Sequence, residues 1–150
     1  GPNHEELSSL IGIYDYFMAL YKHHYKNYKL SIREKIQKVN ELIADHEKEI
    51  ANPILNYIHN REDLNLIGKK IISNKDRAPT IAFTSNNKTS KEVSKILVSN
   101  KIATRNDNFY AWRCLEAMGI DTEDGLVRLS LTHYNSKKDS DLALKALNNL

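Results

Sequence analysis

The stretch LVRLSLTHYNS, residues 126–136, decides the fold of this chain. Apolar and polar residues alternate from Val127 onward, which predicts a strand from Leu126 to Thr132 with one buried face. The strand carries Arg128 near its centre and runs directly into the polar cluster HYNS. The pattern alone leaves two interpretations of Arg128 open: a solvent-facing residue, which is the commoner role of an arginine, or a cation directed at a carboxylate.

Short elements surround this strand. The TSKE sequence at 89–92 is a capping box that begins a helix. Gly119 is expected to end another helix, and Asn135 or Ser136 to cap the last one. In chain order the sequence predicts a strand over 64–73, a turn at 74–76, a strand over 79–84, a helix over 89–100, a strand over 102–104, a polar loop at 105–108, a helix over 109–118, the strand over 126–132 and a helix over 138–150.

Two longer helices are predicted before residue 60. Apolar residues at helical spacing indicate the first, from Glu5 to about Tyr28. The SIRE sequence at 31–34 is a capping box for the second, and Pro53 predicts a kink or break near Ile50 because it removes one backbone hydrogen bond. Neither helix can bury its apolar side alone, so each must pack against another element.

The element order predicts an α+β fold: two long N-terminal helices followed by a small, mostly antiparallel sheet covered by helices. The opening Gly-Pro, residues 1–2, is interpreted as the scar of a cleaved expression tag. Residues 3–60 are expected to form the long interdomain helices, and residues 61–150 the small α+β domain.

Composition excludes several classes of protein. The chain has 150 residues, of which 41% are hydrophobic and 27% charged, as in an ordinary globular domain. No apolar run is long enough to span a bilayer, and the N-terminus does not resemble a secretory signal. The single cysteine, Cys114, excludes an internal disulfide and a cysteine-built zinc site, and favours a reducing, cytoplasmic location.

The positive charge is concentrated locally. Between Tyr21 and Lys38 there are six basic residues and one acidic residue, against a net charge of +3 for the whole chain. Such a stretch can attract phosphates, but it is more often the solvated face of a helix. His23-His24 and His46 have no spacing typical of metal ligands, so no metal site is expected.

Three stretches, in this order, resemble one enzyme family: RAPTIAFT (77–84), KEVSKILVSNKIATR (91–105) and LVRLSLTHYNSKKDSDLALKALNNL (126–150). They are similar to the C-terminal small domain of class V aminotransferases, which have fold type I and depend on pyridoxal phosphate (PLP). The most similar branch is the cysteine desulfurase-like proteins. The shared pattern is a Pro-containing strand, a helix leading to a short strand, and an Arg-bearing strand that ends in Tyr-Asn-(Thr/Ser). Asn3-His4-Glu5 also resembles the family segment that leaves the cofactor domain.

The resemblance implies a role for Arg128. In the enzymes that this chain resembles, the arginine at this position holds the α-carboxylate of the amino-acid substrate. A guanidinium suits that task because its planar fork of donors binds a carboxylate through two parallel hydrogen bonds. The fixed orientation matters because PLP chemistry requires a defined bond at Cα to stand perpendicular to the cofactor ring.

The resemblance also implies further substrate-binding residues beside Arg128: His133, Asn135 and Tyr110. His133 and Asn135 are expected to line the cleft. Tyr110 stands where true desulfurases carry the nucleophilic cysteine, in the loop RNDNFY (105–110). Cys114 lies further along, on a predicted helix, and is expected to be buried and structural. Direct desulfurase activity is therefore disfavoured, since that reaction needs an exposed thiolate in the loop.

No catalytic residue is expected in this chain. It contains no His-Lys dipeptide to supply a Schiff-base lysine, and no Gly-rich phosphate loop. The resemblance therefore implies the C-terminal portion of a longer, dimeric enzyme acting on an amino acid, inactive alone, whose PLP is bound by the missing large domain.

Two alternatives of another class remain. In the first, the chain is a stand-alone interaction or nucleic-acid-binding module that uses its basic helices. In the second, it is a fragment that mainly mediates dimerisation through exposed apolar stripes. The basic and aromatic residues do not form a known nucleic-acid motif, which argues against nucleic acid as a partner.

Overall fold

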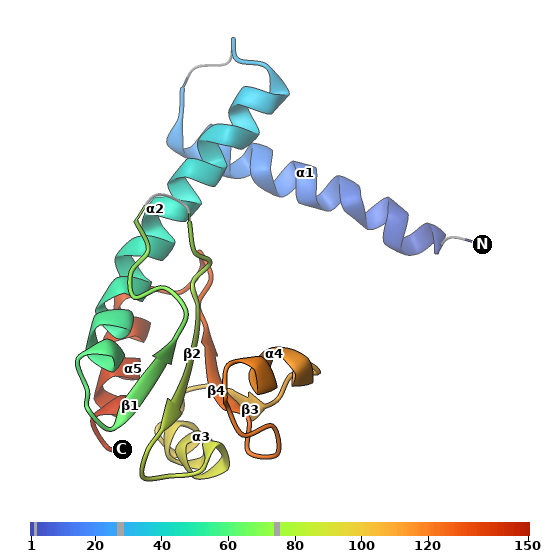
Figure 1. Cartoon of the computed structure of the whole chain (residues 1–150). Helices are drawn as coiled ribbons and strands as arrows, with labels where there is room; N and C mark the ends of the chain where they lie inside the picture. Colours follow the sequence, from blue (N-terminus) through green and yellow to red (C-terminus); the bar gives the residue numbers. More distant parts are fainter. Residues whose placement is uncertain (2, 27–28, 74–75) are drawn as a thin grey trace. The chain divides into compact units, whose positions relative to one another are not determined.

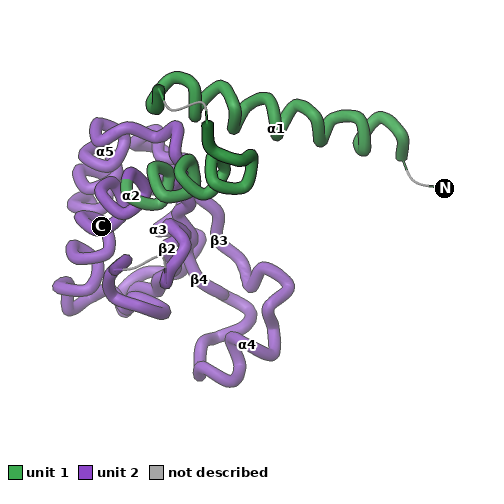
Figure 2. The backbone as a smooth tube through the Cα atoms, turned by 90° about the horizontal axis from the view of Figure 1, so that it is seen from above, with its two compact units in different colours: residues 1–45 green, residues 46–150 purple. Residues whose placement is uncertain are grey.

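Figure 1 shows the computed structural model of the chain, which describes residues 1, 3–26, 29–73 and 76–150. The chain divides into two compact units, residues 1–45 and 46–150, coloured separately in Figure 2. The predicted domains 3–60 and 61–150 stay a prediction. The tag scar at position 2, the helix end near Tyr28 and most of the turn at 74–76 lie outside the described residues.

The first unit is built from α1 (His4–His24) and the beginning of α2 (Ile32–His59). Asn3 caps α1: its side-chain oxygen accepts hydrogen bonds from the Glu5 and Glu6 amides at 3.1 and 3.3 Å. Within this unit the Tyr21 and Tyr25 rings stack at 5.1 Å. Tyr21 is buried and anchors the end of the helix.

Helix α2 begins as the sequence predicts. The Ser31 amide donates to the Glu34 carboxylate at 2.8 Å, and the Glu34 amide donates to the Ser31 hydroxyl at 3.4 Å. The sequence predicted a kink or a break near Ile50. There is no break, since α2 continues through Pro53 to His59. The side chains around the proline, Ile50 and Ile54 among them, are fully buried, so their packing offsets the one lost hydrogen bond.

The second unit confirms the α+β class (Figure 1). Its sheet is antiparallel throughout, with the strand order β1-β2-β4-β3. After the last part of α2, the elements are β1 (Leu64–Ile67), β2 (Thr80–Ser85), α3 (Ser90–Ser99), β3 (Arg105–Asp107), α4 (Trp112–Ala117), β4 (Leu126–Ser130) and α5 (Lys137–Leu147).

The core lies on one face of this sheet. Strand side chains alternate between the two faces, and the inward set packs with α3, α5 and the end of α2. Ser140 links two of these helices, since its buried hydroxyl donates to the Ile50 carbonyl at 2.7 Å. The fully buried strand residues of the core are Ile81, Phe83 and Val127. Arg128 follows Val127 on β4 and therefore lies on the opposite face of the sheet.

Three of the differences from the predicted element boundaries occur at left-handed residues. Strand β1 ends at Ile67 instead of Ser73 because Gly68 has φ +92°. The strand expected over 102–104 is instead β3, at 105–107. Lys101 (φ 63°) takes the left-handed position after α3, and the Ile102 amide caps that helix by donating to the Leu97 carbonyl at 3.0 Å.

Helix α4 is the third difference. It was predicted from Phe109 but begins at Trp112, because Phe109 and Tyr110 have φ values of 53° and 59°, which no α-helix contains. Its predicted end is confirmed: Gly119 has φ 69°, and the Ile120 amide donates to the Leu115 carbonyl at 2.9 Å.

Helix α5 gives a first testable prediction. The Asp139 carboxylate accepts hydrogen bonds from the amide and hydroxyl of Ser136 at 2.7 and 2.9 Å, and these bonds hold the pKa of Asp139 below its usual value. A carboxylate with a lowered folded-state pKa stabilises the fold above about pH 4, and this stabilisation is lost as the pH falls through the folded pKa.

We therefore expect Asp139→Asn to lose less stability than the wild type when the pH falls from about 5 to about 3. Urea unfolding of the 150-residue chain at both pH values measures the difference. Asp141→Asn is the matched control, since it removes the same charge from α5 without removing the capping bonds. An equal acid sensitivity of Asp139→Asn and the wild type would contradict the assignment.

Candidate functional site

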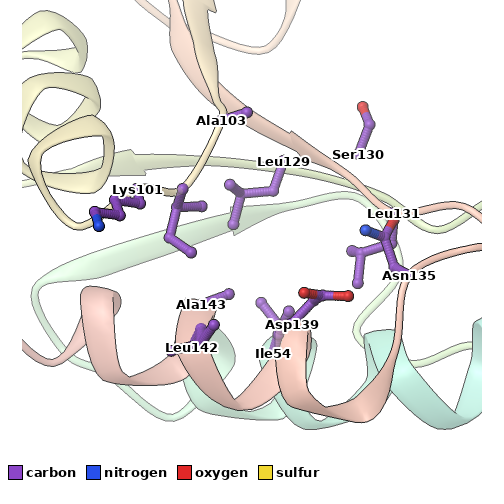
Figure 3. A pocket seen from close by; sticks show the side chains of 11 residues that line it. Ile54, Lys101, Ala103, Leu129, Ser130, Leu131, Asn135, Asp139, Leu142 and Ala143 are labelled. Atoms are coloured by element: carbon purple, nitrogen blue, oxygen red, sulfur yellow. The ribbon is translucent and has the colours of Figure 1, made fainter.

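The candidate site is centred on Arg128, on the face of the sheet that the core leaves free. In the antiparallel register Arg128 pairs with Ala82 of β2 and with Arg105 of β3. Figure 3 shows the alternation directly: the Leu129 side chain points toward α5, and that of Ser130 points to the other side of β4. Arg128 shares the face of Ser130, because residues two apart on a strand point the same way.

The Arg128 side chain is not a solvated surface cation. It is half-buried, and its Nε atom is fully buried without a hydrogen-bond partner. None of its guanidinium nitrogens donates a hydrogen bond to a residue that the structure describes. A buried polar group without a partner costs free energy, so such groups in a native protein point to a missing ligand or to strain.

The charges around Arg128 also indicate a missing ligand. Arg105 lies directly opposite it on the neighbouring strand, and like charges in that position repel. Within the described ranges, with their gaps at 2, 27–28 and 74–75, neither arginine forms an ion pair. Asp107 shares this face with Arg105, but it accepts a hydrogen bond from the Asn108 amide and forms no ion pair with either arginine. This face of the sheet therefore has guanidinium donors that no described carboxylate pairs with, as an anion-binding site requires.

One aromatic ring lies against the Arg128 guanidinium. The Cζ atom of Arg128 is 4.3 Å from the centroid of the Phe109 ring, which is within the range of a cation–π contact. Phe109 belongs to the loop between β3 and α4. Sequence reasoning missed its contact with Arg128. The family pattern placed Phe109 in the loop 105–110 and the helical pattern placed it at the start of the helix 109–118, but nothing in the sequence signals two successive left-handed aromatic residues.

The loop that carries Phe109 is held by Asn108. The Asn108 side chain donates to the Thr122 carbonyl at 3.3 Å and accepts from the Tyr110 amide at 3.1 Å. Gly125 packs directly behind the loop with φ 71°. A Cβ atom added at Gly125 would lie 2.7 Å from the Asn108 nitrogen, and closer still to the carbonyl of Asp107.

The other predicted site residues lie in two places. Tyr110 is next to Phe109 in the same loop, and its side chain is fully exposed. His133 and Asn135 lie together in the turn after β4, where the Asn135 carbonyl oxygen is 2.8 Å from Nε2 of His46. Tyr110 thus directly follows the residue whose ring lies against Arg128, and His133 and Asn135 share one turn. Their roles in binding substrate stay predictions.

Asn135 already has a structural task. Its side-chain oxygen accepts hydrogen bonds from the Thr132 amide at 2.9 Å and from the Thr132 hydroxyl at 3.2 Å, which fixes the turn. Ser136 caps α5, as one of the two sequence alternatives predicted. Beside the turn, burial raises the pKa of Glu47, although the neighbouring His133 and His46 act in the opposite direction.

A cavity of about 270 Å³ lies on the other, core-facing side of β4 (Figure 3). Leu129, Leu131, Leu142 and Ala143 form its apolar wall, and Asn135 and Asp139 lie at its edge. Arg128 does not line this cavity. The anion site on the free face and this cavity are therefore two separate features.

Two further residues revise the sequence interpretation. Cys114 was expected to be buried, but it is exposed, because the short helix α4 lies outside the main core. It is on that helix and not in the loop at 105–110, so the argument against direct desulfurase chemistry now rests on position alone.

Arg77, which the sequence reasoning passed over, has a second buried Nε without a partner, and burial lowers its pKa.

Over residues 1, 3–26, 29–73 and 76–150, no three His, Cys, Asp or Glu side chains are grouped closely enough to hold a metal ion. In the same part of the chain, no helix combines the length and the apolar character that crossing a membrane requires.

Comparison with known families decides the identity of the fold. The family model described as aminotransferase class-V matches residues 32–142, which includes both β4 and the loop before α4. The chain belongs to the class-V aminotransferase family. The resemblance seen in the sequence is thereby confirmed.

Individual relatives agree with this assignment. The aminotransferase-like protein FGM3 of Gibberella zeae is 26% identical over 108 residues, covering 71% of this chain and 27% of that protein. The cysteine desulfurase CsdA of Escherichia coli has a TM-score of 0.61 at 17% identity, over 79% of this chain and 28% of that one. The apo cysteine desulfurase of Thermococcus onnurineus NA1 has a TM-score of 0.62 at 20% identity, over 79% and 29%.

The two solved structures show that this class-V aminotransferase chain shares their fold. The chain spans less than a third of the length of each of these relatives. Its matched residues correspond to only a part of those proteins. The activity of the protein to which this chain belongs is therefore proposed below.

Proposed function

We propose that this chain is the substrate-carboxylate-binding, C-terminal portion of a PLP-dependent enzyme of the class-V aminotransferase family, and that it acts on an amino acid. The observation that carries the proposal is Arg128, a half-buried guanidinium with a buried, unpartnered Nε and no ion pair to a described residue. A substrate α-carboxylate would supply the missing acceptors.

The described residues fit the substrate better than the cofactor. Arg128 offers hydrogen-bond donors to an anion, and the exposed Arg105 opposite it adds positive charge to the same face. The sequence has no His-Lys dipeptide that would resemble the family's Schiff-base lysine. The proposal therefore assigns PLP to a part of the protein outside these residues, where the cofactor would act as the electron sink for chemistry at Cα.

The contribution of this chain would be binding and orientation. Two parallel hydrogen bonds from a guanidinium fix the plane of a carboxylate, so Arg128 would set the rotation of the substrate about its bond to Cα. Tyr110, His133 and Asn135 would complete this wall of the site. The side-chain oxygen of Asn135 is already used in the turn, so a contact of this residue with substrate would be made by its amide group.

Two wider parts of the proposal rest on less specific features. A cytoplasmic location is supported by the use of one cysteine, which is exposed. A homodimer is supported by large apolar side chains that α1 leaves exposed, which a monomer would not conceal. These side chains are Leu7, Leu10, Ile11, Ile13, Tyr14 and Tyr16.

The proposal is tested by loading the full-length protein with PLP and titrating it with L-alanine and L-cysteine, and with ethylamine and cysteamine, which lack the carboxylate. We expect the amino acids to change the absorbance of the bound cofactor at concentrations about a hundredfold lower than the amines. The same sample should elute in gel filtration at twice the mass of one chain. Equal responses to acids and amines would refute the carboxylate site, and elution at the mass of one chain would refute the homodimer.

A further inference from the structure

We propose that Phe109 is a positioning residue: its ring holds the Arg128 guanidinium in place for the substrate carboxylate without itself touching the substrate. This inference rests on the proposed function of Arg128. It adds the residue that keeps the guanidinium in position to bind the substrate carboxylate.

The contact between the two side chains is the first step. Cζ of Arg128 lies 4.3 Å from the Phe109 ring centroid, so the ring attracts the cation through its negative face. An acidic partner would also hold the arginine, but it would occupy the donors and compete with an incoming carboxylate. An aromatic ring restrains a long, flexible side chain and supplies no competing anion.

The second step is the repulsion that the ring must counter. Arg105 stands opposite Arg128 in the register, on the same face of the sheet. Like charges in directly opposed positions drive each other away. Without Phe109, Arg128 would have neither an ion pair nor a hydrogen bond from the described residues to keep its guanidinium in one place, because Nε has no partner either.

The third step is the backbone that presents the ring. Phe109 and Tyr110 are successive residues in the left-handed region, at φ 53° and 59°. Non-glycine residues avoid this region, and strain of this kind persists where the surroundings enforce it, often at functional sites. The surroundings here are the Asn108 hydrogen bonds to Thr122 and Tyr110 and the close packing of Gly125.

A purely structural role explains these observations less well. The Phe109 side chain is only half-buried and is not a member of the main core, whose aromatic residue is Phe83. A ring placed to bury apolar area would not need a strained backbone or a cation against its face. The geometry instead matches a ring that is directed at one guanidinium.

The test uses a matched pair of variants at position 109 in the PLP-loaded full-length protein. Phe109→Asn removes the ring, and asparagine tolerates the left-handed backbone, so the fold is retained. Phe109→Tyr keeps the ring. Trp112→Leu removes an exposed aromatic side chain from the adjacent helix α4 and serves as the control.

We expect Phe109→Asn to weaken binding of L-alanine about tenfold and to leave binding of ethylamine unchanged, whereas Phe109→Tyr and Trp112→Leu stay within about twofold of the wild type. In an Arg128→Ala background, Phe109→Asn should have no further effect, because the ring acts through the arginine. An equal loss in both backgrounds would show that the ring touches the substrate, and would overturn the inference.

A second readout does not depend on the cofactor. In a ¹⁵N–¹H spectrum of the 150-residue chain, the buried Arg128 Nε–H should exchange with solvent at least about tenfold faster in Phe109→Asn than in the wild type or Phe109→Tyr. Unchanged exchange would overturn the inference, even if Arg128→Ala weakens L-alanine binding as proposed. If Arg128→Ala leaves L-alanine binding intact while Phe109→Asn speeds the exchange of the Arg128 Nε–H, the proposed function fails. Only the contact between Phe109 and Arg128 is then established.

Discussion

Replacing Arg128 with alanine in the full-length, PLP-loaded protein should weaken the binding of L-alanine about a hundredfold and leave the cofactor bound. Truncating one partner of a buried, hydrogen-bonded charge pair costs roughly 2–5 kcal/mol, and a hundredfold change corresponds to about 2.7 kcal/mol. The effect is large because the guanidinium has no other acceptor among the described residues. Titration of the cofactor absorbance with L-alanine gives both dissociation constants.

Arg105→Ala is the control for this experiment. Arg105 lies directly opposite Arg128 and carries the same charge, but its side chain is exposed. Removing an exposed charge should change L-alanine binding by no more than about threefold, through the long-range field alone. Equal losses in the two variants would mean that the carboxylate responds to net charge on this face, and that no specific contact with Arg128 exists.

The second large effect is expected for Gly125→Ala, which should lower the free energy of unfolding of the 150-residue chain by about 3 kcal/mol. Two costs combine at this position. The backbone has φ 71°, and the added methyl group would collide with the backbone of Asp107 and Asn108. Backbone atoms cannot move aside as the end of a flexible side chain can, so the β3–β4 region must shift.

Gly119→Ala separates the two costs. Its φ of 69° is nearly the same, but an added Cβ atom would meet nothing within 4 Å. The loss there should be about 1 kcal/mol, from the left-handed backbone alone. Urea unfolding of both variants measures the difference. Similar losses for the two alanine variants would show that the loop behind Phe109 is not tightly packed, which would also weaken the case for a fixed ring.

The elements that local sequence could predict are those with local causes. The predicted capping boxes at Ser31 and Thr89 both form, because each needs only a hydroxyl and a carboxylate three residues apart. Ser136, one of the two caps predicted for the last helix, forms a third box with Asp139. The strand predicted over 126–132 forms as β4, although it ends at Ser130. These signals depend on a few neighbouring residues, so the rest of the fold does not alter them.

The boundaries that were wrong depend on the backbone at single residues. Lys101, Phe109 and Tyr110 adopt left-handed conformations that their residue types avoid. Tertiary contacts impose those conformations, and no local pattern in the sequence reports them. The displaced strand β3 and the late start of α4 both follow from them. A break near Ile50, one of the two outcomes expected from Pro53, does not occur for a related reason, since buried neighbours hold the helix together.

The site was predictable only in part. Arg128 was found from its place on a strand together with the family resemblance, and the structure shows why it stands out: it is unpaired and half-buried. The contact with Phe109 joins residues nineteen positions apart in the chain through a strained loop, which sequence reasoning did not reach. Tyr110, His133 and Asn135 remain predictions from the family pattern. The exposure of Cys114 followed from the shortness of α4, which the predicted helix over 109–118 concealed.

The central claim is that Arg128 binds the carboxylate of the substrate. Its most direct test is a thermodynamic cycle in which the arginine and the substrate carboxylate are removed separately and together. Dissociation constants for L-alanine and ethylamine are measured with the wild-type, full-length protein and with Arg128→Ala. If Arg128 binds the carboxylate, loss of that group should weaken binding about a hundredfold in the wild type and less than about threefold in the variant. If removing the carboxylate has the same effect in both proteins, the carboxylate is bound elsewhere, and the account is contradicted.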